Sequence, residues 1–141
     1  MSASGDEDRE KSTTEAGSEL LGLLIRHTDA WNSHDLEDLM SLFADDCVFE
    51  ASGGDEVTGK RFEGHVDVRR AFADVLESMP DAQWGGGRHH VLAADYGVSE
   101  WTLTGTLSDG RRVEVDGCDF LRVSEGKIVL KSSFRKQRPP F

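Results

Sequence analysis

The sequence predicts an α+β domain in which helices come first and a curled sheet follows. Apolar residues recur at helical spacing in the first half of the chain, as far as Pro80. The second half instead alternates apolar and polar residues in four segments separated by short turns rich in Gly, Asp and Ser. Consecutive strands linked in this way form an antiparallel meander. We therefore expect the helices to cover one face of a mostly antiparallel sheet.

Three helices are expected in the first half. The first begins at Ser18, a suitable N-cap, and places Leu20, Leu24, His27 and Trp31 on one face. A turn over residues 32–35 leads to a second helix, whose apolar stripe consists of Leu36, Leu39, Met40 and Phe43. The third helix covers about residues 66–79 and stops at Pro80.

The stretch from Ala30 to Glu50 joins the first two helices to the first strand. Residues 47–50 are predicted to be a short strand whose polar end, Glu50, lies at the wall of a cavity. A Gly-rich connection follows, with a possible hairpin partner around residues 57–62. The remaining strands are expected at residues 84–93, with a bulge at Gly85–Gly87, and at 98–107, 112–123 and 127–136.

Length and composition indicate one domain. The chain has 141 residues, which suits a single core. Residues 1–17 are Ser, Thr, Gly and charged residues, and we expect a disordered acidic tail there. Residues 18–138 form the predicted domain, and residues 139–141 end the chain.

Charge and hydropathy exclude several classes of function. The formal net charge of −11 disfavours nucleic acid and anionic membranes as partners. No apolar run approaches the roughly 20 residues that cross a bilayer, and no signal-peptide core is present, so a cytoplasmic protein is expected. Cys47 and Cys118 lie too far apart in sequence for a disulfide framework or a metal knuckle, and the histidines lack the spacing of metal ligands. We expect no metal and no cofactor.

The order of elements, with WNSHDLEDLMSLFADDCVFE early and GCDFLRVSEGKIVLKSSFRK late, resembles the nuclear transport factor 2-like superfamily. Within it, the chain is similar to SnoaL-like polyketide cyclases and ketosteroid isomerase-like enzymes from about Glu19 to Lys136. The resemblance implies a cone-shaped fold with a strongly curved sheet that encloses a pocket, and a homodimer. Because this fold hosts isomerases, dehydratases, cyclases and binding modules, the resemblance alone does not assign a function.

The resemblance also implies roles for individual residues. Glu50 takes the position of the proton-shuttling carboxylate of ketosteroid isomerase-like proteins, and His27 takes that of a tyrosine donor. The second oxyanion donor is missing, because Val115 stands at its position. Asp119 lies four residues further along the same strand and therefore on the same face.

Two other branches of the superfamily give different matches. In the scytalone dehydratase-like branch the strand histidine corresponds to His90, or to His89 if the register slips by one across Gly85–Gly87. In the epoxide hydrolase-like branch the catalytic positions fall on Trp101, Leu103 and Ser133. These residues lack the required arginine and carboxylates, so we exclude that activity.

Proton abstraction next to a carbonyl needs a base that titrates near neutral pH and a donor for the developing oxyanion. A carboxylate among Trp31, Phe49 and Trp101 would be desolvated, which is expected to raise its pKa. An imidazole such as that of His90 already titrates near neutral pH, so its pKa would need little adjustment for this role. Alternation places Lys131 on the same face of the last strand as Ser133 and Arg135. That face either lies at the cavity mouth, toward an anionic substrate group, or is simply solvated.

We therefore expect a small-molecule enzyme that performs isomerisation, dehydration or aldol-type cyclisation on a hydrophobic, cyclic carbonyl compound. The alternative is a ligand-binding or dimerisation module without turnover. A pocket shared by His90 and Asp119 would favour the enzyme. The candidate catalytic residues are His90, Asp119, Glu50 and His27, and the candidate substrate-binding residues are Trp31, Phe49, Trp101, Val115, Ser133 and Arg135.

Overall fold

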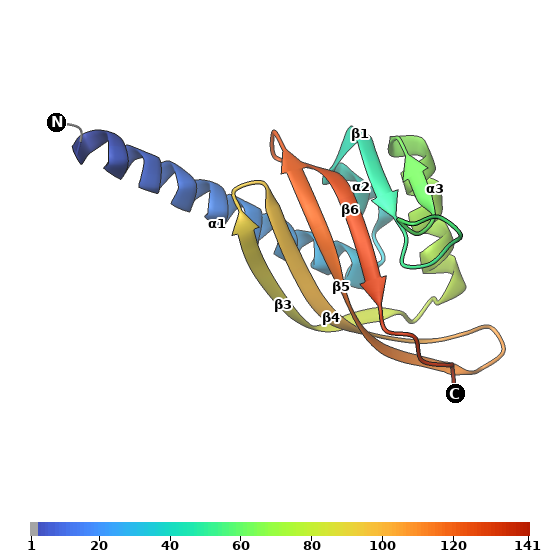
Figure 1. Ribbon diagram of the computed structural model, residues 1–141. Coiled ribbons are helices and arrows are strands. Elements are labelled where there is room, and N and C mark those ends of the chain that lie inside the picture. The colour runs from blue at the N-terminus through green and yellow to red at the C-terminus, as the bar shows by residue number, and fades with distance from the viewer. Residues whose placement is uncertain (1–2) are drawn as a thin grey trace.

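Three helices cover one face of a curved six-stranded sheet within residues 3–141 (Figure 1). The computed structural model describes the backbone of residues 3–141 and the side chains of residues 15–141. The elements are α1 (Ala3–Ser33), α2 (Leu36–Ser41), β1 (Phe43–Glu50), β2 (Arg61–Glu63), α3 (His65–Ser78), β3 (Gln83–Ala93), β4 (Tyr96–Thr106), β5 (Arg112–Ser124) and β6 (Lys127–Arg135). The predicted α+β class is confirmed.

The sheet has the strand order β2-β1-β6-β5-β4-β3. Strands β3 to β6 pair antiparallel with their sequence neighbours, which confirms the predicted meander. β1 pairs parallel to β6, so the sheet is mixed. Its edges, β2 and β3, do not pair with each other, and the curved sheet forms an open cone. The register of β3 shifts between Gly85 and Arg88, where a bulge was predicted.

The first helix differs from its prediction at its start. It begins at Ala3 rather than at Ser18. The residues before Ser18 include Ala, Glu, Lys and Arg, which favour helices without any apolar stripe, and the predicted boundary relied on that stripe. Residues 1 and 2 lie outside the described residues, and disorder of the segment 1–17 stays a prediction.

The first two strands also differ from their predictions. β1 begins at Phe43, which was expected to belong to the second helix, and passes through Asp45 and Asp46. Its register with β6 shifts between Phe43 and Val48, so the acidic pair lies in an irregular stretch. β2 covers only Arg61–Glu63 instead of residues 57–62.

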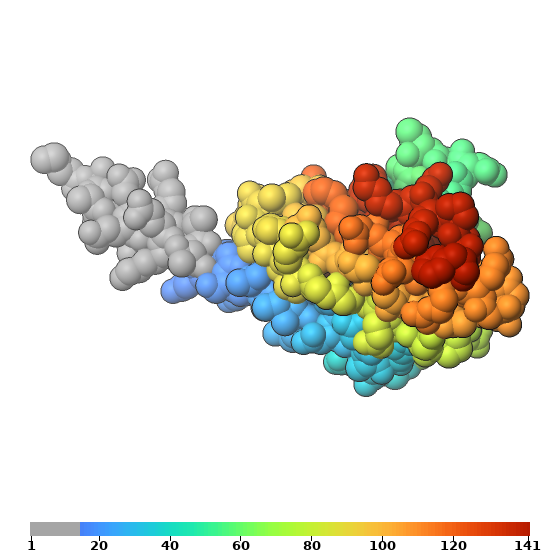
Figure 2. Space-filling model, turned by 90° about the horizontal axis from the view of Figure 1, so that it is seen from below, coloured from blue at the N-terminus to red at the C-terminus, as the bar shows by residue number. Residues whose placement is uncertain are grey.

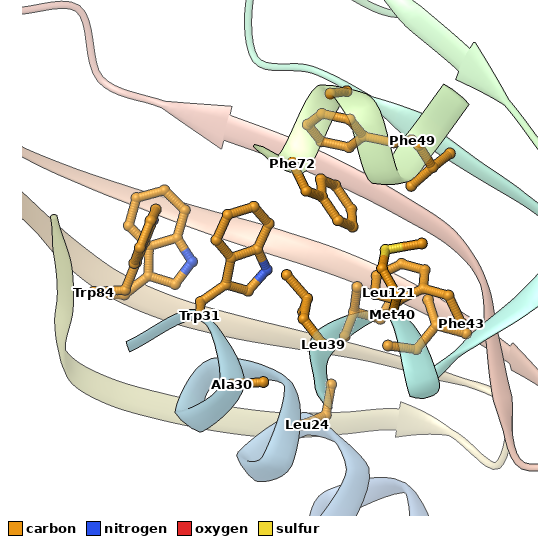
Figure 3. Close-up of a cluster of buried hydrophobic side chains, with 14 of the residues drawn as sticks. Leu24, Ala30, Trp31, Leu39, Met40, Phe43, Phe49, Phe72, Trp84 and Leu121 are labelled. Atoms are coloured by element: carbon orange, nitrogen blue, oxygen red, sulfur yellow. The ribbon is translucent and has the colours of Figure 1, made fainter. Parts of the chain in front are cut away.

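The core lies between the helices and the concave face of the sheet. Phe72 of α3 is fully buried, and its ring centroid lies 4.8 Å from that of Trp31, 5.0 Å from that of Phe49 and 5.2 Å from that of Phe43 (Figure 3). The elements α1, β1 and α3 thus meet at the Phe72 ring. None of the helices described has the length and apolar character needed to cross a bilayer.

Replacing Phe72 with Ala is expected to reduce the free energy of unfolding by about 3–5 kcal/mol, because it leaves a cavity among three aromatic side chains. Urea denaturation measures the change. Phe134→Ala is the control, since that side chain is 55% exposed, and we expect it to cost below about 1 kcal/mol. Equal costs for the two variants would contradict the position of the core.

Candidate active site

A pocket of about 310 Å³ opens between α1, α3 and the concave face of the sheet. Its volume lies at the lower end of the range typical of small-molecule sites. The aromatic side chains of its wall are Trp31, Phe49, Phe62, Trp84 and Trp101, and the charged or hydroxyl-bearing ones are Ser52, Lys60, Asp74, Asp119, Lys131, Ser133 and Arg135. Trp31 and Trp84 lie side by side in Figure 3, with ring centroids 5.0 Å apart.

An ion pair occupies the buried end of this pocket. The Lys131 ammonium lies 3.0 Å from Oδ2 of Asp119, and each side chain is only 5% exposed. The ammonium also lies 5.1 Å from the centre of the Trp31 ring and 6.0 Å from that of Phe49. The pair is therefore surrounded by aromatic faces that exclude water and favour a cation.

Neighbouring strands supply the other contacts of Asp119. Ser133 lies opposite Asp119 in the β5–β6 register, and its hydroxyl donates to Oδ1 at 2.6 Å. Trp101 of β4 lies diagonally across from Asp119, and its indole Nε1–H donates to Oδ2 at 3.0 Å. The indole crosses above Gly117, where a Cβ would lie 2.5 Å from the ring. A glycine at this position therefore lets Trp101 reach Asp119.

His27 connects the pair to α1. Its side chain is fully buried, and its Nε2 lies 3.2 Å from Nε1 of Trp31 and 3.4 Å from Nζ of Lys131. An indole nitrogen only donates, so Nε2 of His27 accepts and the proton resides on Nδ1. Nδ1 is buried and has no hydrogen-bond partner among the described residues. Such an unsatisfied donor costs about 1–3 kcal/mol and therefore calls for an explanation.

Burial and charge act differently on the pKa values of these groups. Burial opposes the ionised carboxylate of Asp119, but the Lys131 charge and the Ser133 hydrogen bond outweigh it, so the pKa of Asp119 is lowered. This corrects the expectation that desolvation would raise the pKa of a carboxylate among these aromatic residues. For Lys131, burial outweighs the attraction of Asp119 and lowers the pKa of the ammonium. Burial and the nearby Lys131 hold the pKa of His27 well below its ordinary value.

Six of the residues predicted from the sequence line this one pocket: Trp31, Phe49, Trp101, Asp119, Ser133 and Arg135. His27 lies behind them and contacts the ion pair without being part of the pocket wall. Their roles in binding or catalysis stay predictions.

Glu50 and Val115 lie outside the pocket. Successive strand residues point to opposite faces, so Phe49 faces the pocket and Glu50 does not. Glu50 instead forms an ion pair with Arg61 at 3.0 Å. Val115 is buried four residues before Asp119 in β5 and lines another hollow near the C-terminal residues.

The expected shared pocket of His90 and Asp119 is not present. His90 is exposed, and its Nε2 lies 2.8 Å from Oε2 of Glu100 on the outer face of the sheet. His89 points to the inner face, where its Nδ1 lies 2.7 Å from the Ser99 hydroxyl, but it does not line the pocket either. The bulge at Gly85–Gly87 determines which of the two histidines points to the inner face of the sheet.

Several pocket residues were absent from the predicted site, among them Lys60, Trp84 and Lys131. Lys131 shares the inner face of β6 with Ser133 and Arg135, as alternation indicated. The partner of Lys131, Asp119, lies on another strand, and no sequence spacing links the two residues. Buried cations are rare, so an isolated lysine in a basic segment gives no signal of burial.

Replacing His27 with Gln is expected to flatten the pH dependence of stability. The folded protein keeps His27 neutral, whereas the unfolded chain binds a proton at this residue below about pH 6.5. His27 therefore lowers the free energy of unfolding by up to about 1.4 kcal/mol for each pH unit below that value. Gln retains an acceptor for Trp31 and Lys131 and removes the titration.

Urea denaturation between about pH 5 and about pH 7 measures this slope. Phe134→Ala, which removes an exposed side chain without a titratable group, is the control and should keep the wild-type slope. An unchanged slope in His27→Gln would show that His27 is not held neutral by the fold.

Comparison with known proteins agrees with this architecture. The model of the SnoaL-like domain family matches residues 24–131. Among solved structures, a candidate polyketide cyclase from Xanthomonas campestris pv. campestris superposes with a TM-score of 0.76 at 16% identity, covering 84% of this chain and 91% of that one. A candidate isomerase from Bacillus subtilis gives 0.73 at 15% identity, with coverage of 86% and 88%.

A protein of unknown function from an Exiguobacterium species, described as NTF2-like, gives a TM-score of 0.67 at 22% identity, covering 82% of this chain and 99% of that one. No curated protein matches the chain. At these identities the structural likeness shows the fold alone. The family match covers most of the chain, and the protein therefore belongs to the SnoaL-like domain family.

Proposed function

We propose that this protein is an enzyme that moves a proton next to the carbonyl group of a hydrophobic, cyclic small molecule, with Asp119 and Lys131 as the reacting side chains. The observation that carries the proposal is the buried ion pair at the end of an apolar pocket. Burying two charges is expensive, and a hydrophobic pair of similar volume would usually serve stability as well or better. A buried pair that lines an accessible pocket is therefore better explained by chemistry than by stability.

In the proposed reaction, the substrate carbonyl oxygen accepts a hydrogen bond from the Lys131 ammonium. The Asp119 carboxylate takes the proton from the adjacent carbon, and the electrons of the broken C–H bond move to the oxygen to give an enolate. The lowered pKa of Asp119 keeps it ionised but makes it a weaker base than one that titrates near neutral pH, so the reaction requires stabilisation of the enolate to offset this weakness. Lys131 stabilises that negative charge in a site with little water. Return of the proton from Asp119 to another carbon gives isomerisation. Its transfer to a departing β-hydroxyl gives dehydration with release of water, and its transfer to the alkoxide formed when the enolate attacks a second carbonyl gives cyclisation.

The contacts around the pair suit this role. Trp101 and Ser133 hold both oxygens of Asp119 in place. His27 accepts from Lys131 and thereby keeps the ammonium directed between two acceptors. Such fixed donors stabilise a developing charge without reorganising during the reaction. The names of the polyketide cyclase and isomerase candidates with this fold are consistent with the proposal. A cytoplasmic location and pairing into a homodimer, which the composition and the family resemblance suggested, stay predictions.

Exchange of hydrogen for deuterium next to a ketone tests the proposal without knowledge of the natural substrate. Cyclohexanone, 1-indanone and 1-tetralone would be incubated with the protein in D₂O and followed by proton NMR. The wild type is expected to accelerate exchange of at least one ketone over buffer. Asp119→Asn and Lys131→Gln are each expected to reduce the acceleration roughly 100-fold or more, because each removes a group that acts in the transition state.

Glu50→Gln and His90→Gln are the matched controls, since both residues lie outside the pocket, and they should retain the wild-type rate. Circular dichroism would establish that every variant is folded. Exchange that persists in Asp119→Asn, or that depends on Glu50 or His90 instead, would refute the assignment. Absence of exchange with all three ketones would favour the ligand-binding alternative.

A further inference from the structure

The pocket carries an excess of positive charge in an acidic protein. The chain has 27 Asp and Glu residues against 16 Lys and Arg residues. The pocket wall nevertheless contains three cations, Lys60, Lys131 and Arg135, and two carboxylates, Asp74 and Asp119. Because the surrounding protein is so acidic, a chance collection of side chains would have the opposite sign. This local excess of cations calls for an explanation.

The three cations differ in their partners. Lys131 is buried and neutralised by Asp119. Lys60 and Arg135 are exposed, and neither forms an ion pair with a carboxylate among the residues whose side chains are described. Most other arginines of that part of the chain do pair with a carboxylate. The unpaired cations thus lie at the outer rim of the pocket and the neutralised one lies at its buried end.

Local structure holds the two unpaired cations at the rim. The backbone N–H of Ala51 donates to the Lys60 carbonyl at 2.9 Å, which closes the loop between β1 and β2. Gly59 permits that closure, because it has a φ of 74° and a Cβ there would collide with the Ala51 carbonyl oxygen. Figure 2 shows this loop, in green, projecting beside the C-terminal segment, in red.

Arg135 connects the end of β6 to that loop. Its Nε donates to the Ser52 hydroxyl at 3.3 Å, which leaves the terminal nitrogens of the guanidinium without a hydrogen-bond partner among the residues with described side chains. Two parallel N–H donors of a guanidinium match the two oxygens of a carboxylate. Lys60 lies over the Phe62 ring, 5.2 Å from its centre, and adds a second positive charge on the same wall.

We propose that the pocket takes substrates that carry a carboxylate, which binds at the rim to Arg135 and Lys60 while the rest of the molecule lies among the tryptophans. The position of the reacting carbonyl against Lys131 and Asp119 rests on the proposed function, whereas the carboxylate subsite does not. Asp74 on α3 also lines the rim and repels an anion, so it directs the acid group toward the side of Arg135. The substrate class is thus a cyclic keto acid.

Intrinsic fluorescence reports binding directly, because all three tryptophans of the protein line this pocket. The probes are 4-oxocyclohexanecarboxylate and the matched neutral amide, 4-oxocyclohexanecarboxamide. Their ketone groups absorb only weakly where tryptophan is excited and do so equally, so the same correction for absorbed light applies to both. The wild type is expected to bind the carboxylate about tenfold more tightly than the amide, the effect of one charge-assisted hydrogen bond. Added salt should reduce this preference, because the rim is exposed.

Three variants locate the effect. Arg135→Gln is expected to abolish the preference for the carboxylate, and Asp74→Asn is expected to increase it. Arg122→Gln is the control: this arginine packs on Tyr96 on the outer face of the same sheet and, like Arg135, has no carboxylate partner among the residues with described side chains. It should retain the preference, although it changes the net charge of the protein by the same amount.

Equal affinity for the two probes, absence of binding by both, or an equal loss in Arg122→Gln and Arg135→Gln would overturn the inference. Its failure is distinguishable from failure of the proposed function. Binding needs no proton transfer, so a protein that prefers the carboxylate but exchanges hydrogen neither in the three ketones nor in 4-oxocyclohexanecarboxylate refutes the enzyme alone. A protein that exchanges a neutral ketone but shows no preference between the probes refutes only the carboxylate subsite.

Discussion

The ion pair between Asp119 and Lys131 is the interaction on which the interior of this protein depends. Neither charge could remain inside the cone alone, because an uncompensated buried ion costs several kcal/mol. Each of the two therefore requires the other and requires the donors and acceptors around them. Trp101 and Ser133 satisfy the carboxylate, and His27 accepts from the ammonium. The sheet supplies four of these five groups from three adjacent strands, and α1 supplies the fifth.

The same arrangement links the fold to the proposed chemistry. The aromatic walls that bury the pair lower the pKa of Lys131, and the charge of Lys131 in turn lowers the pKa of Asp119. A pair of this kind keeps a carboxylate ionised and an ammonium close to it in a space that excludes most water. The open rim has a different character, since its cations have no carboxylate partner among the residues with described side chains and are available to a ligand. The pocket thus combines a dry reactive end with an open, positively charged entrance.

Much of the fold could be predicted from the sequence, because alternation and turns specify strands locally. Asp119, Trp101 and Ser133 line the pocket, and the family resemblance together with alternation had pointed to them as candidates. Phe49 and Glu50 were both predicted to line the pocket. The sequence alone excludes this, because adjacent residues of a strand point to opposite faces of the sheet. Lys131 was recognised as a neighbour of Ser133 but not as buried, because the carboxylate that stabilises it belongs to another strand. The choice between His89 and His90 depended on a bulge whose register the sequence does not specify.

A double-mutant cycle on the free energy of unfolding tests the central claim, that Asp119 and Lys131 form one mutually dependent buried unit. Asp119→Asn and Lys131→Met, each alone, are expected to cost about 3–5 kcal/mol, because each leaves the other charge buried without its partner. The double variant should cost far less than the sum, since no charge then remains at the site. Additive costs would mean that the two side chains do not depend on each other, and would contradict this account of the pocket.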